Sequence, residues 1–318
     1  MRSVVYERYG SPEVLRVEDV PVPDPGPDQV LVRVVATSVN LTDWECLLGR
    51  PFYSRIGGLR YPANRTLGSD IAGQVVAVGA DVKGFGVGDE VYGDNLMSKG
   101  GFAEYAVVGE LNLARKPKDL TFAQASTIPQ AGAIALQGTD GAGPGRRLLV
   151  NGGGGGSGLF AIQLAKRLGS HVTGVDNAGK LDFMRSLGAD VVIDYRKEDF
   201  TRCDEPNDFV IDVVADGSVF AYRRALARGG HYRCVGGSVP TLLRVVTIGA
   251  VAGFVTGRKI GLLGVKEGPA HFAPVADLCV AGDVAIHIDR TYSLDEVPEA
   301  LACVGEGRAL GKVVVEID

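Results

Sequence analysis

The 318-residue sequence predicts an α/β protein in which a β-rich part accompanies a doubly wound parallel sheet, and two observations lead to this prediction. Residues 1–120 consist mainly of short strand-like runs separated by Gly and Pro, the pattern of a barrel-like β domain. From residue 121 onward, strand-like runs alternate with amphipathic stretches. Such alternation implies parallel strands joined by right-handed helical crossovers.

The expected elements follow from hydrophobic periodicity and from the Gly and Pro breaks. In the β-rich part we expect strands at 14–20, 29–36, 71–79 and 102–108, with a loop over 37–66. In the alternating part we expect strands at 147–151, 171–175, 190–194, 208–214, 230–235 and 260–265, and helices at 122–138, 158–168, 179–187 and 218–227. Residues 241–257 predict a helix that lines a pocket or a subunit contact. The last segment predicts helices at 270–281 and 295–305 and strands at 286–288 and 312–317.

A glycine-rich turn is the most informative segment of the chain. The strand-like run 147–151 leads into five consecutive glycines, Ser157 and Gly158, and then into the amphipathic stretch 159–169. Glycine lets a backbone turn tightly and approach a pyrophosphate, whose charge is stabilised by the free N–H groups of the following helix. A flexible linker is the alternative, but linkers are rarely flanked by strand and helix patterns. We therefore expect a dinucleotide to be bound by Gly152, Gly155, Gly156, Ser157 and Gly158.

The next strand-like run ends at Asp176, about 20 residues beyond the turn, where an acidic residue can hold the adenine ribose. This spacing, together with the strand–turn–helix context, predicts a Rossmann nucleotide-binding domain.

Composition and charge exclude several classes of function. The net charge of −5 argues against nucleic acid as the main partner, because no basic excess would offset phosphate repulsion. The apolar run 245–255 is too short to cross a bilayer, and the N-terminal segment lacks the apolar core of a secretory signal. Five scattered cysteines predict reduced thiols. We expect a cytoplasmic protein.

Several motifs in sequence order resemble those of the medium-chain dehydrogenase/reductase superfamily, in particular its zinc-free quinone oxidoreductase branch. They are Ser38–Trp44, Leu67–Val75, Gly88–Gly93, Gly100–Tyr105, the glycine turn, Ser186–Asp190, Val192–Tyr195 and Gly311–Val314. The resemblance implies a discontinuous GroES-like catalytic domain over 1–120 and 266–318 and a Rossmann domain over 121–265. It also implies a cleft between these domains for the nicotinamide and the substrate.

The resemblance further implies the absence of zinc and a set of catalytic residues. Asn40 stands where zinc-dependent relatives have their first ligand, and Gly68-Ser69-Asp70 stands where they have Gly-His-Glu. Amide and hydroxyl oxygens rarely hold zinc, so we expect no metal. The implied reaction is hydride transfer to a quinone or an α,β-unsaturated carbonyl. We expect Asn40 to bind the substrate carbonyl or the nicotinamide ribose, Tyr53 to donate a proton or to pack, and Asp43 to act mainly as a capping residue.

The choice of cofactor rests on three residues. Asp176 favours NAD(H), because its charge would repel a 2′-phosphate. Lys180 and Tyr195 align with positions where relatives that use NADP hold that phosphate, and the resemblance therefore favours NADP(H), with NAD(H) possible. It also implies cofactor contacts for Val235, Gly236, Gly237 and Lys312.

Two other functions stay open at this point. One is an enoyl-thioester reductase or a tailoring reductase of secondary metabolism. The other is an NAD(P)H-binding sensor or structural protein without turnover. The resemblance also implies a homodimer, for which strand 260–265 would supply the pairing edge.

Overall fold

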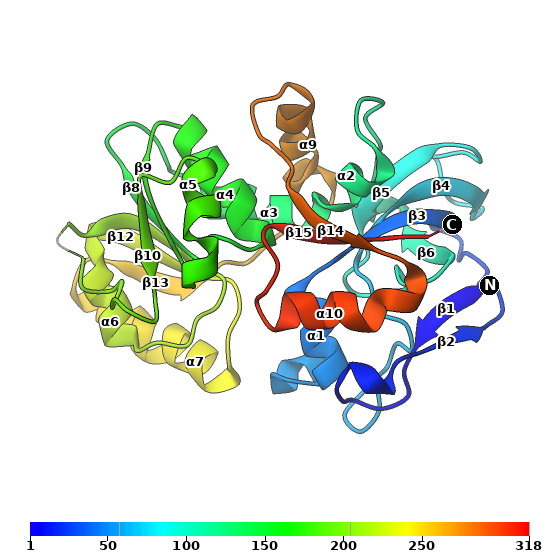
Figure 1. Cartoon of the computed structure of the whole chain (residues 1–318), viewed down its shortest axis with the longest axis horizontal. Coiled ribbons are helices and arrows are strands. Elements are labelled where there is room, and N and C mark those ends of the chain that lie inside the picture. The colour runs from blue at the N-terminus through cyan, green and yellow to red at the C-terminus, as the bar shows by residue number, and fades with distance from the viewer. Residues whose placement is uncertain (57, 204, 318) are drawn as a thin grey trace. The chain divides into compact units, whose positions relative to one another are not determined.

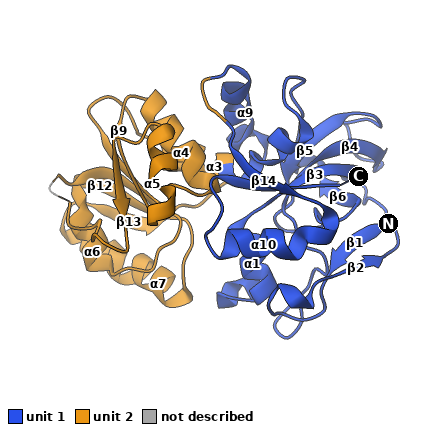
Figure 2. Cartoon of the chain, viewed as in Figure 1, with its two compact units in different colours: residues 1–131, 267–282, 286–318 blue, residues 132–266, 283–285 orange. Residues whose placement is uncertain are grey.

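A computed structural model describes residues 1–56, 58–203 and 205–317. The chain forms two compact units (Figure 2). Unit 1 comprises Met1–Ala131, Glu267–Gly282 and Ile286–Asp318, and unit 2 comprises Gly132–Lys266 and Asp283–Ala285. The expected domain boundaries, at residues 120 and 266, stay a prediction.

Unit 1 is built on a seven-stranded sheet with the strand order β14-β15-β3-β4-β5-β7, in which β6 also pairs with β3 (Figure 1). Its strands are β3 (Gln29–Val39), β4 (Asp70–Val78), β5 (Glu90–Asp94), β6 (Tyr105–Gly109), β7 (Leu113–Arg115), β14 (Ile288–Tyr292) and β15 (Lys312–Glu316). A separate antiparallel pair joins β1 (Arg2–Val5) to β2 (Arg16–Asp19). The pairing of β15 with β3 is antiparallel and brings the end of the chain beside the residues that precede Asn40.

Helices cover the sheet of unit 1 and bury a core rich in valine. They are α1 (Leu41–Leu48), α2 (Phe122–Ser126), α9 (Ala273–Val280) and α10 (Val297–Gly305), and α3 (Pro129–Gly138) runs from unit 1 into unit 2. Short 3-10 helices lie at Pro12–Val14, Phe52–Arg55, Glu110–Asn112, Pro269–His271 and Leu294–Glu296. Val30, Val32 and Val34 of β3 point into the core together with Val313 and Val315 of β15, as expected for period-two burial in a strand.

Unit 2 is a six-stranded sheet with the order β10-β9-β8-β11-β12-β13, and all of its pairings are parallel. Its strands are β8 (Arg147–Asn151), β9 (His171–Asp176), β10 (Val191–Asp194), β11 (Asn207–Asp212), β12 (Leu226–Cys234) and β13 (Lys259–Leu262). Its helices are α4 (Gly156–Arg167), α5 (Leu181–Ser186), α6 (Val219–Ala225), α7 (Val239–Arg244) and α8 (Ala250–Val255), with a 3-10 turn at Ala178–Lys180 and a π-helical turn at Val245–Gly249. The strand order reverses between β8 and β11, where doubly wound sheets bind their ligands. The predicted fold class is confirmed.

The structure corrects several of the expected elements, among them the strand expected at 286–288, since β14 spans Ile288–Tyr292. The prediction of a loop over 37–66 is wrong, because β3 continues to Val39 and α1 starts at Leu41. Asn40 is the N-cap of α1 and its backbone N–H donates to Asp43 Oδ2, which stabilises the start of this helix. The single helix expected over 122–138 is instead α2 and α3, because Pro129 lacks an N–H and disfavours helical backbone at the residue before it.

Candidate active site

The glycine turn in unit 2 joins β8 to α4 by close backbone contacts. Gly152 has a φ of 87°, a conformation that favours glycine, and a Cβ there would lie 2.3 Å from Val213 Cγ2. A Cβ on Gly158 would lie 2.4 Å from the Gly152 carbonyl oxygen. Gly155 is the N-cap of α4, and a Cβ there would meet only an ordinary contact at 3.5 Å. The helix therefore starts directly at the turn, with Ser157 in its first turn and its first N–H groups available to an anion.

Asp176 holds this turn from the end of β9. One carboxylate oxygen, Oδ2, accepts from the Gly154 backbone N–H at 3.0 Å. The other, Oδ1, accepts from the backbone N–H of Asn177 at 2.8 Å and lies 3.8 Å from the Lys180 ammonium. Lys180 is itself buried. Both oxygens of Asp176 are thus engaged by unit 2, and its charge has a cationic neighbour.

Tyr195 lies beside Asp176, and Arg196 follows it. The Tyr195 N–H donates to the Asp176 carbonyl oxygen at 3.2 Å, and its half-exposed ring lies 5.5 Å from the Arg196 guanidinium. The sequence predicted no arginine for a 2′-phosphate, because residues 177–179, directly after Asp176, include none. The structure places a second cation, Arg196, directly after Tyr195 at the end of the next strand.

A buried carboxylate, Asp212, joins the carboxyl ends of three strands of unit 2. It accepts from Asn151 Nδ2 at 2.8 Å, from the Tyr232 hydroxyl at 2.7 Å and from the Val214 N–H at 3.1 Å. Burial raises the pKa of Asp212 to about 6, although these donors favour its charged form. Its carbonyl oxygen also accepts from the Val235 N–H at 2.9 Å.

The segment that follows β12 is held against the segment that follows β11. Ala215 forms an isolated parallel bridge with Gly237, and a Cβ on Gly237 would lie 2.6 Å from the Ala215 carbonyl oxygen. Val235, Gly236 and Gly237 therefore lie at the same sheet edge as the glycine turn, where β8 and β11 end.

The corresponding polar centre of unit 1 is built from buried side chains. Asn40 Oδ1 accepts from the Lys312 ammonium at 2.7 Å, and Asn40 Nδ2 donates to Asp70 Oδ2 at 2.8 Å and to Ser69 Oγ at 3.2 Å. Lys312 lies 3.5 Å from Asp70, and both side chains are almost fully buried. An ammonium can only donate and a carboxylate can only accept, so these neighbours fix the orientation of the Asn40 amide.

Asp70 is the most connected member of this centre. In addition to the contacts with Asn40 and Lys312, it accepts from the Ser38 hydroxyl at 2.8 Å and from the Gln130 N–H at 3.0 Å. Burial lowers the pKa of the Lys312 ammonium, and the negative charge of Asp70 opposes this effect.

A second group of charged residues surrounds the start of α1. Asp43, fully buried, accepts from the Asn40 and Gly68 N–H groups at 3.0 and 3.2 Å and lies 3.7 Å from the Lys99 ammonium. Burial raises the pKa of Asp43. Lys99 has a left-handed φ of 59°, and within the described ranges its buried ammonium has no hydrogen-bond partner. Such strain in a lysine is uncommon and occurs mostly where the surrounding structure enforces it.

Tyr53 is connected to this group by a contact with Glu45. The Tyr53 hydroxyl lies 3.5 Å from Glu45 Oε2, a contact at the outer limit of a hydrogen bond. Burial raises the pKa of Glu45 to about 7, while Tyr53 and Lys99 favour its charged form. Asp94, whose backbone pairs with that of Asp70 between β4 and β5, has a pKa raised to about 8 by burial and by the charge of Asp70.

Comparison with known proteins gives the family. Residues 26–118 match the alcohol dehydrogenase GroES-like domain, and residues 187–315 match a family described as zinc-binding dehydrogenase. The chain is 37% identical to 2-methylene-furan-3-one reductase of Solanum lycopersicum, over 99% of this chain and 79% of that protein. It is 35% identical to an NADPH-dependent alkenal/one oxidoreductase of Arabidopsis thaliana chloroplasts, over 87% of this chain and 75% of that protein. The chain belongs to the medium-chain dehydrogenase/reductase superfamily, in its quinone oxidoreductase-like branch.

Among solved structures, the present chain is similar to the quinone oxidoreductase from Coxiella burnetii, with a TM-score of 0.90 and 28% identity. The match covers 100% of this chain and 99% of that one. Unit 1 accordingly contains the GroES-like fold and unit 2 the Rossmann-like sheet. The protein is a nicotinamide-dependent oxidoreductase.

The predicted site residues of this oxidoreductase form two groups. Unit 1 brings Asn40, Asp43 and Lys312 into one buried centre, with Tyr53 connected through Glu45. Unit 2 brings the glycine turn, Asp176, Lys180 and Tyr195 together, with Val235–Gly237 at the same sheet edge. Their roles toward cofactor and substrate stay predictions. Sequence reasoning assigned no role to Glu45, Asp70, Lys99, Arg196 or Asp212.

The zinc that the family description names does not fit the residues at the matching positions. Asn40 Oδ1 is already bound by an ammonium, and the Ser69 hydroxyl accepts from Asn40. A dication beside Lys312 would be repelled, and neither thiolate nor imidazole belongs to this centre. Among residues 1–56, 58–203 and 205–317, no three His, Cys, Asp or Glu side chains are grouped so that they could hold a metal ion.

Proposed function

We propose that this protein transfers hydride from NADPH to a quinone or an α,β-unsaturated carbonyl without a metal ion. The observation that carries the proposal is the pair of polar centres. Unit 2 offers a glycine cradle suited to a pyrophosphate, and unit 1 replaces the zinc ligands of relatives with an amide already bound to an ammonium. A conjugated acceptor needs a Lewis acid less than an alcohol does, because the negative charge that hydride creates is delocalised onto its oxygen.

The preference for NADPH rests on the contacts of Asp176. Its two oxygens bind Gly154 and Asn177, and Lys180 lies beside it, so its charge is partly compensated. The exposed Arg196 beside Tyr195 adds a cation and an aromatic face of the kind that holds a 2′-phosphate. The proposed phosphate contacts are Lys180, Tyr195 and Arg196, with the first N–H groups of α4 on the pyrophosphate.

Asn40 has little free hydrogen-bonding capacity. Both hydrogens of its amide nitrogen are used by Ser69 and Asp70, whereas Oδ1 has accepted one bond and retains a second lone pair. This lone pair can accept a bond from a ribose hydroxyl, but the amide has no free hydrogen for a substrate carbonyl. Of the two roles expected for Asn40, contact with the nicotinamide ribose is therefore the better supported.

Tyr53 and Glu45 are the proposed source of the proton that completes the reduction. Bound NADPH supplies the hydride. Tyr53 donates its hydroxyl proton to the anionic oxygen or the carbon next to the carbonyl, and the resulting phenolate takes the proton of Glu45. Glu45 is suited to this step because its pKa near 7 keeps a substantial fraction protonated at neutral pH.

Separate titrations of NADPH and NADH, followed by turnover assays, test this function. We expect tighter binding of NADPH, loss of that preference in Arg196→Ala, and NADPH oxidation with quinones and enones. Thr247→Ala, an exposed change in unit 2, serves as the control. Preference for NADH would show that Asp176 governs the ribose site. Binding of NADPH without turnover of any acceptor would favour a sensor, and selective turnover of thioesters would favour an enoyl-thioester reductase.

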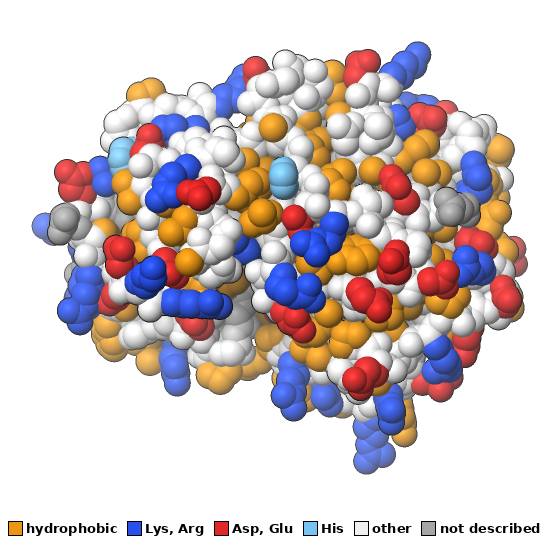
Figure 3. Space-filling model, in the orientation of Figure 1, with side chains coloured by type: hydrophobic (Ala, Val, Ile, Leu, Met, Phe, Trp, Pro, Cys, Tyr) orange, Lys and Arg blue, Asp and Glu red, His pale blue; other side chains and the backbone are white. Residues whose placement is uncertain are grey.

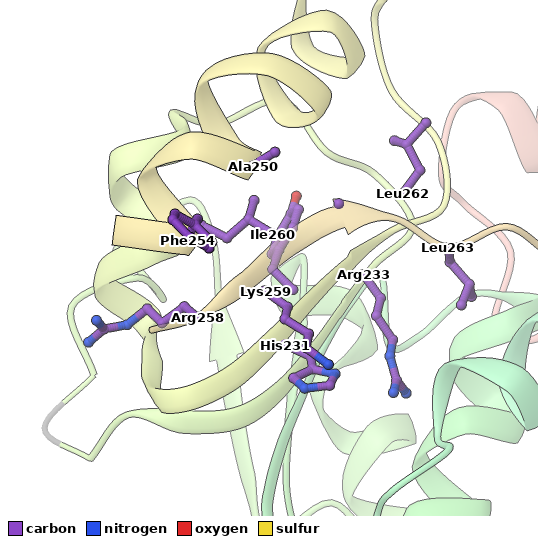
Figure 4. A pocket seen from close by; sticks show the side chains of 11 residues that line it. His231, Arg233, Ala250, Phe254, Arg258, Lys259, Ile260, Leu262 and Leu263 are labelled. Atoms are coloured by element: carbon purple, nitrogen blue, oxygen red, sulfur yellow. The ribbon is translucent and has the colours of Figure 1, made fainter. Parts of the chain in front are cut away.

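We also infer a homodimer formed through β13. This strand is the edge of the unit 2 sheet, and beside it a pocket of about 440 Å³ is lined by Phe254, Arg258, Ile260 and Leu262 (Figure 4). Val251, Phe254 and Val255 of α8 are exposed, an apolar surface next to unpaired strand edges. Light scattering should give the mass of a dimer, and Phe254→Glu should give that of a monomer. A monomeric wild-type protein would contradict the inference.

The described part of the chain contains no helix that is both long and apolar enough to cross a membrane. A cytoplasmic location stays a prediction.

A further inference from the structure

The segment 50–65 of unit 1, between α1 and β4, has an unusual composition. Its four charged residues are all arginines, Arg50, Arg55, Arg60 and Arg65, within a chain whose net charge is −5. The segment also contains two tyrosines, a phenylalanine, an isoleucine and a leucine. We call residues 50–56 and 58–65 the basic–apolar loop.

The apolar side chains of this loop point into solvent. Phe52, Ile56, Leu59 and Tyr61 are between 66% and 80% exposed. Met97 is also strongly exposed, and its carbonyl oxygen accepts from Asn64 Nδ2 at 3.1 Å, which places a fifth apolar side chain near the loop. Figure 3 shows basic and apolar side chains projecting together along the margin of unit 1 below α1 and α10. So many exposed apolar side chains within one short segment indicate an interaction surface.

Contacts from behind fix the loop in this arrangement. The Tyr9 hydroxyl donates to the Gly58 carbonyl oxygen at 2.5 Å, and the Tyr9 ring lies 4.7 Å from the Arg55 guanidinium. Arg55 Nε also donates to the Gly49 carbonyl oxygen at 2.9 Å. The backbone is thereby held to the body of unit 1, while the apolar side chains face outward.

The charges of the loop divide into engaged and available cations. Arg65 pairs with Glu7 and Glu18, and Arg55 is occupied by Tyr9 and Gly49. Arg50 and Arg60 are exposed, and within the part of the chain that the structure describes neither has an acidic partner. Two cations are thus free to bind anions, one on each side of the exposed apolar residues Phe52, Ile56 and Leu59.

We propose that the basic–apolar loop docks on the surface of an anionic lipid membrane. Aromatic and aliphatic side chains enter the boundary between headgroups and acyl chains, and arginines bind lipid phosphates. Protein interfaces typically surround an apolar centre with a polar rim, whereas here arginines alternate with apolar residues along one protruding segment. Docking does not depend on the proposed reaction, although it would bring the protein to acceptors dissolved in lipid.

Cosedimentation of the full-length protein with vesicles tests the proposal without turnover. We expect binding to phosphatidylcholine vesicles that contain phosphatidylglycerol, and about tenfold weaker binding to pure phosphatidylcholine or at high salt. Ile56→Ser and Arg60→Glu should each weaken the binding several-fold. The matched controls are Leu111→Ser and Lys118→Glu, exposed apolar and basic positions of unit 1 outside the loop, and they should leave binding unchanged.

Several outcomes would overturn the docking proposal. The wild-type protein could fail to bind vesicles of either composition, or could bind both equally well. The loop and control variants could also lose vesicle binding to the same extent. If Ile56→Ser instead changes the mass measured by light scattering, the loop is a contact between copies of this chain and the membrane proposal is wrong. All four substitutions are at exposed positions, so each variant should remain folded. Melting temperatures of the variants check this.

Discussion

The two polar centres of this protein differ in the kind of group that builds them. In unit 2 the glycine turn presents main-chain N–H groups, and Asp176 holds it by a bond to the Gly154 backbone. In unit 1 the centre consists of buried side chains, with Asn40, Asp70 and Lys312 bonded to one another. The first centre should therefore be sensitive to an added Cβ, and the second to the loss of any single partner.

The largest expected effect is on the side-chain centre. Lys312→Met leaves the buried carboxylate of Asp70 without its cation, which should lower the free energy of unfolding by about 3–5 kcal/mol in urea denaturation. The double variant Asp70→Asn/Lys312→Met removes both charges while an amide oxygen remains to accept from neighbouring donors, and it should recover part of this loss. Arg308→Met breaks an exposed ion pair and should cost far less. Equal losses in Lys312→Met and Arg308→Met would show that burial does not distinguish the two pairs.

Asp94 extends the comparison to pH, because its backbone pairs with that of Asp70 in the same sheet. Its pKa of about 8 in the folded state exceeds the ordinary value of 3.8, so between these values the folded protein holds a proton that the unfolded chain has lost. Stability from this group is present below pH 4 and is lost as pH rises toward 8, by roughly 3 kcal/mol between pH 5 and 7.5. Asp94→Asn should flatten the dependence of unfolding on pH in that window. A variant with the wild-type slope would assign the titration to another group.

Two glycine substitutions in the same turn test whether close approach of the main chain builds the centre of unit 2. Gly158→Ala forces a Cβ against the Gly152 carbonyl oxygen and should lower stability by about 2 kcal/mol. Gly155→Ala meets only ordinary contacts, so the melting temperature should be nearly unchanged. Its added methyl would face the bound pyrophosphate, and we expect NADPH affinity to fall about tenfold. The claim that main-chain approach builds this site is contradicted if Gly155→Ala binds NADPH as tightly as the wild-type protein.

The smallest expected effect concerns proton supply in unit 1. Because Glu45 has a pKa near 7, its protonated fraction falls as pH rises, and kcat with an enone should decline above pH 7. Glu45→Gln removes the acid and should lower kcat several-fold at pH 6, flatten the profile and leave KM unchanged. Glu13→Gln, an exposed acid of unit 1, is the control. An unchanged pH profile in Glu45→Gln would exclude Glu45 as the proton source.

The same difference explains what the sequence could predict. The strand, turn and helix around Gly152–Gly158 are contiguous, and Asp176 lies at the end of the next strand. The local sequence pattern was therefore sufficient to predict the fold of this region. Lys312 and Asp70 are 242 positions apart, and they meet only because β15 pairs with β3, which pairs with β4. No periodicity in the sequence contains that pairing. Asp70 was therefore seen only as a departure from a family motif.

Other omissions have local physical causes. Asp43 was expected mainly as a capping residue, but the loop expected over 37–66 left out the helix that an Asn with an acid three residues later can start. Arg196 was not linked to the Asp176 site because that link runs through Tyr195, whose backbone contacts Asp176 from the adjacent strand although the two are far apart in sequence. The raised pKa values of Glu45 and Asp212 arise from burial, which residue identity alone does not predict.

In the proposed reaction, unit 2 binds NADPH, and the buried Asn40, Asp70 and Lys312 take the place of a metal centre. The most direct measurement is NADPH oxidation with a quinone and an enone by protein treated with a strong chelator, with metal content determined on the same sample. We predict undiminished turnover by protein that contains only traces of metal. Turnover that is lost on chelation and restored by zinc would contradict the account.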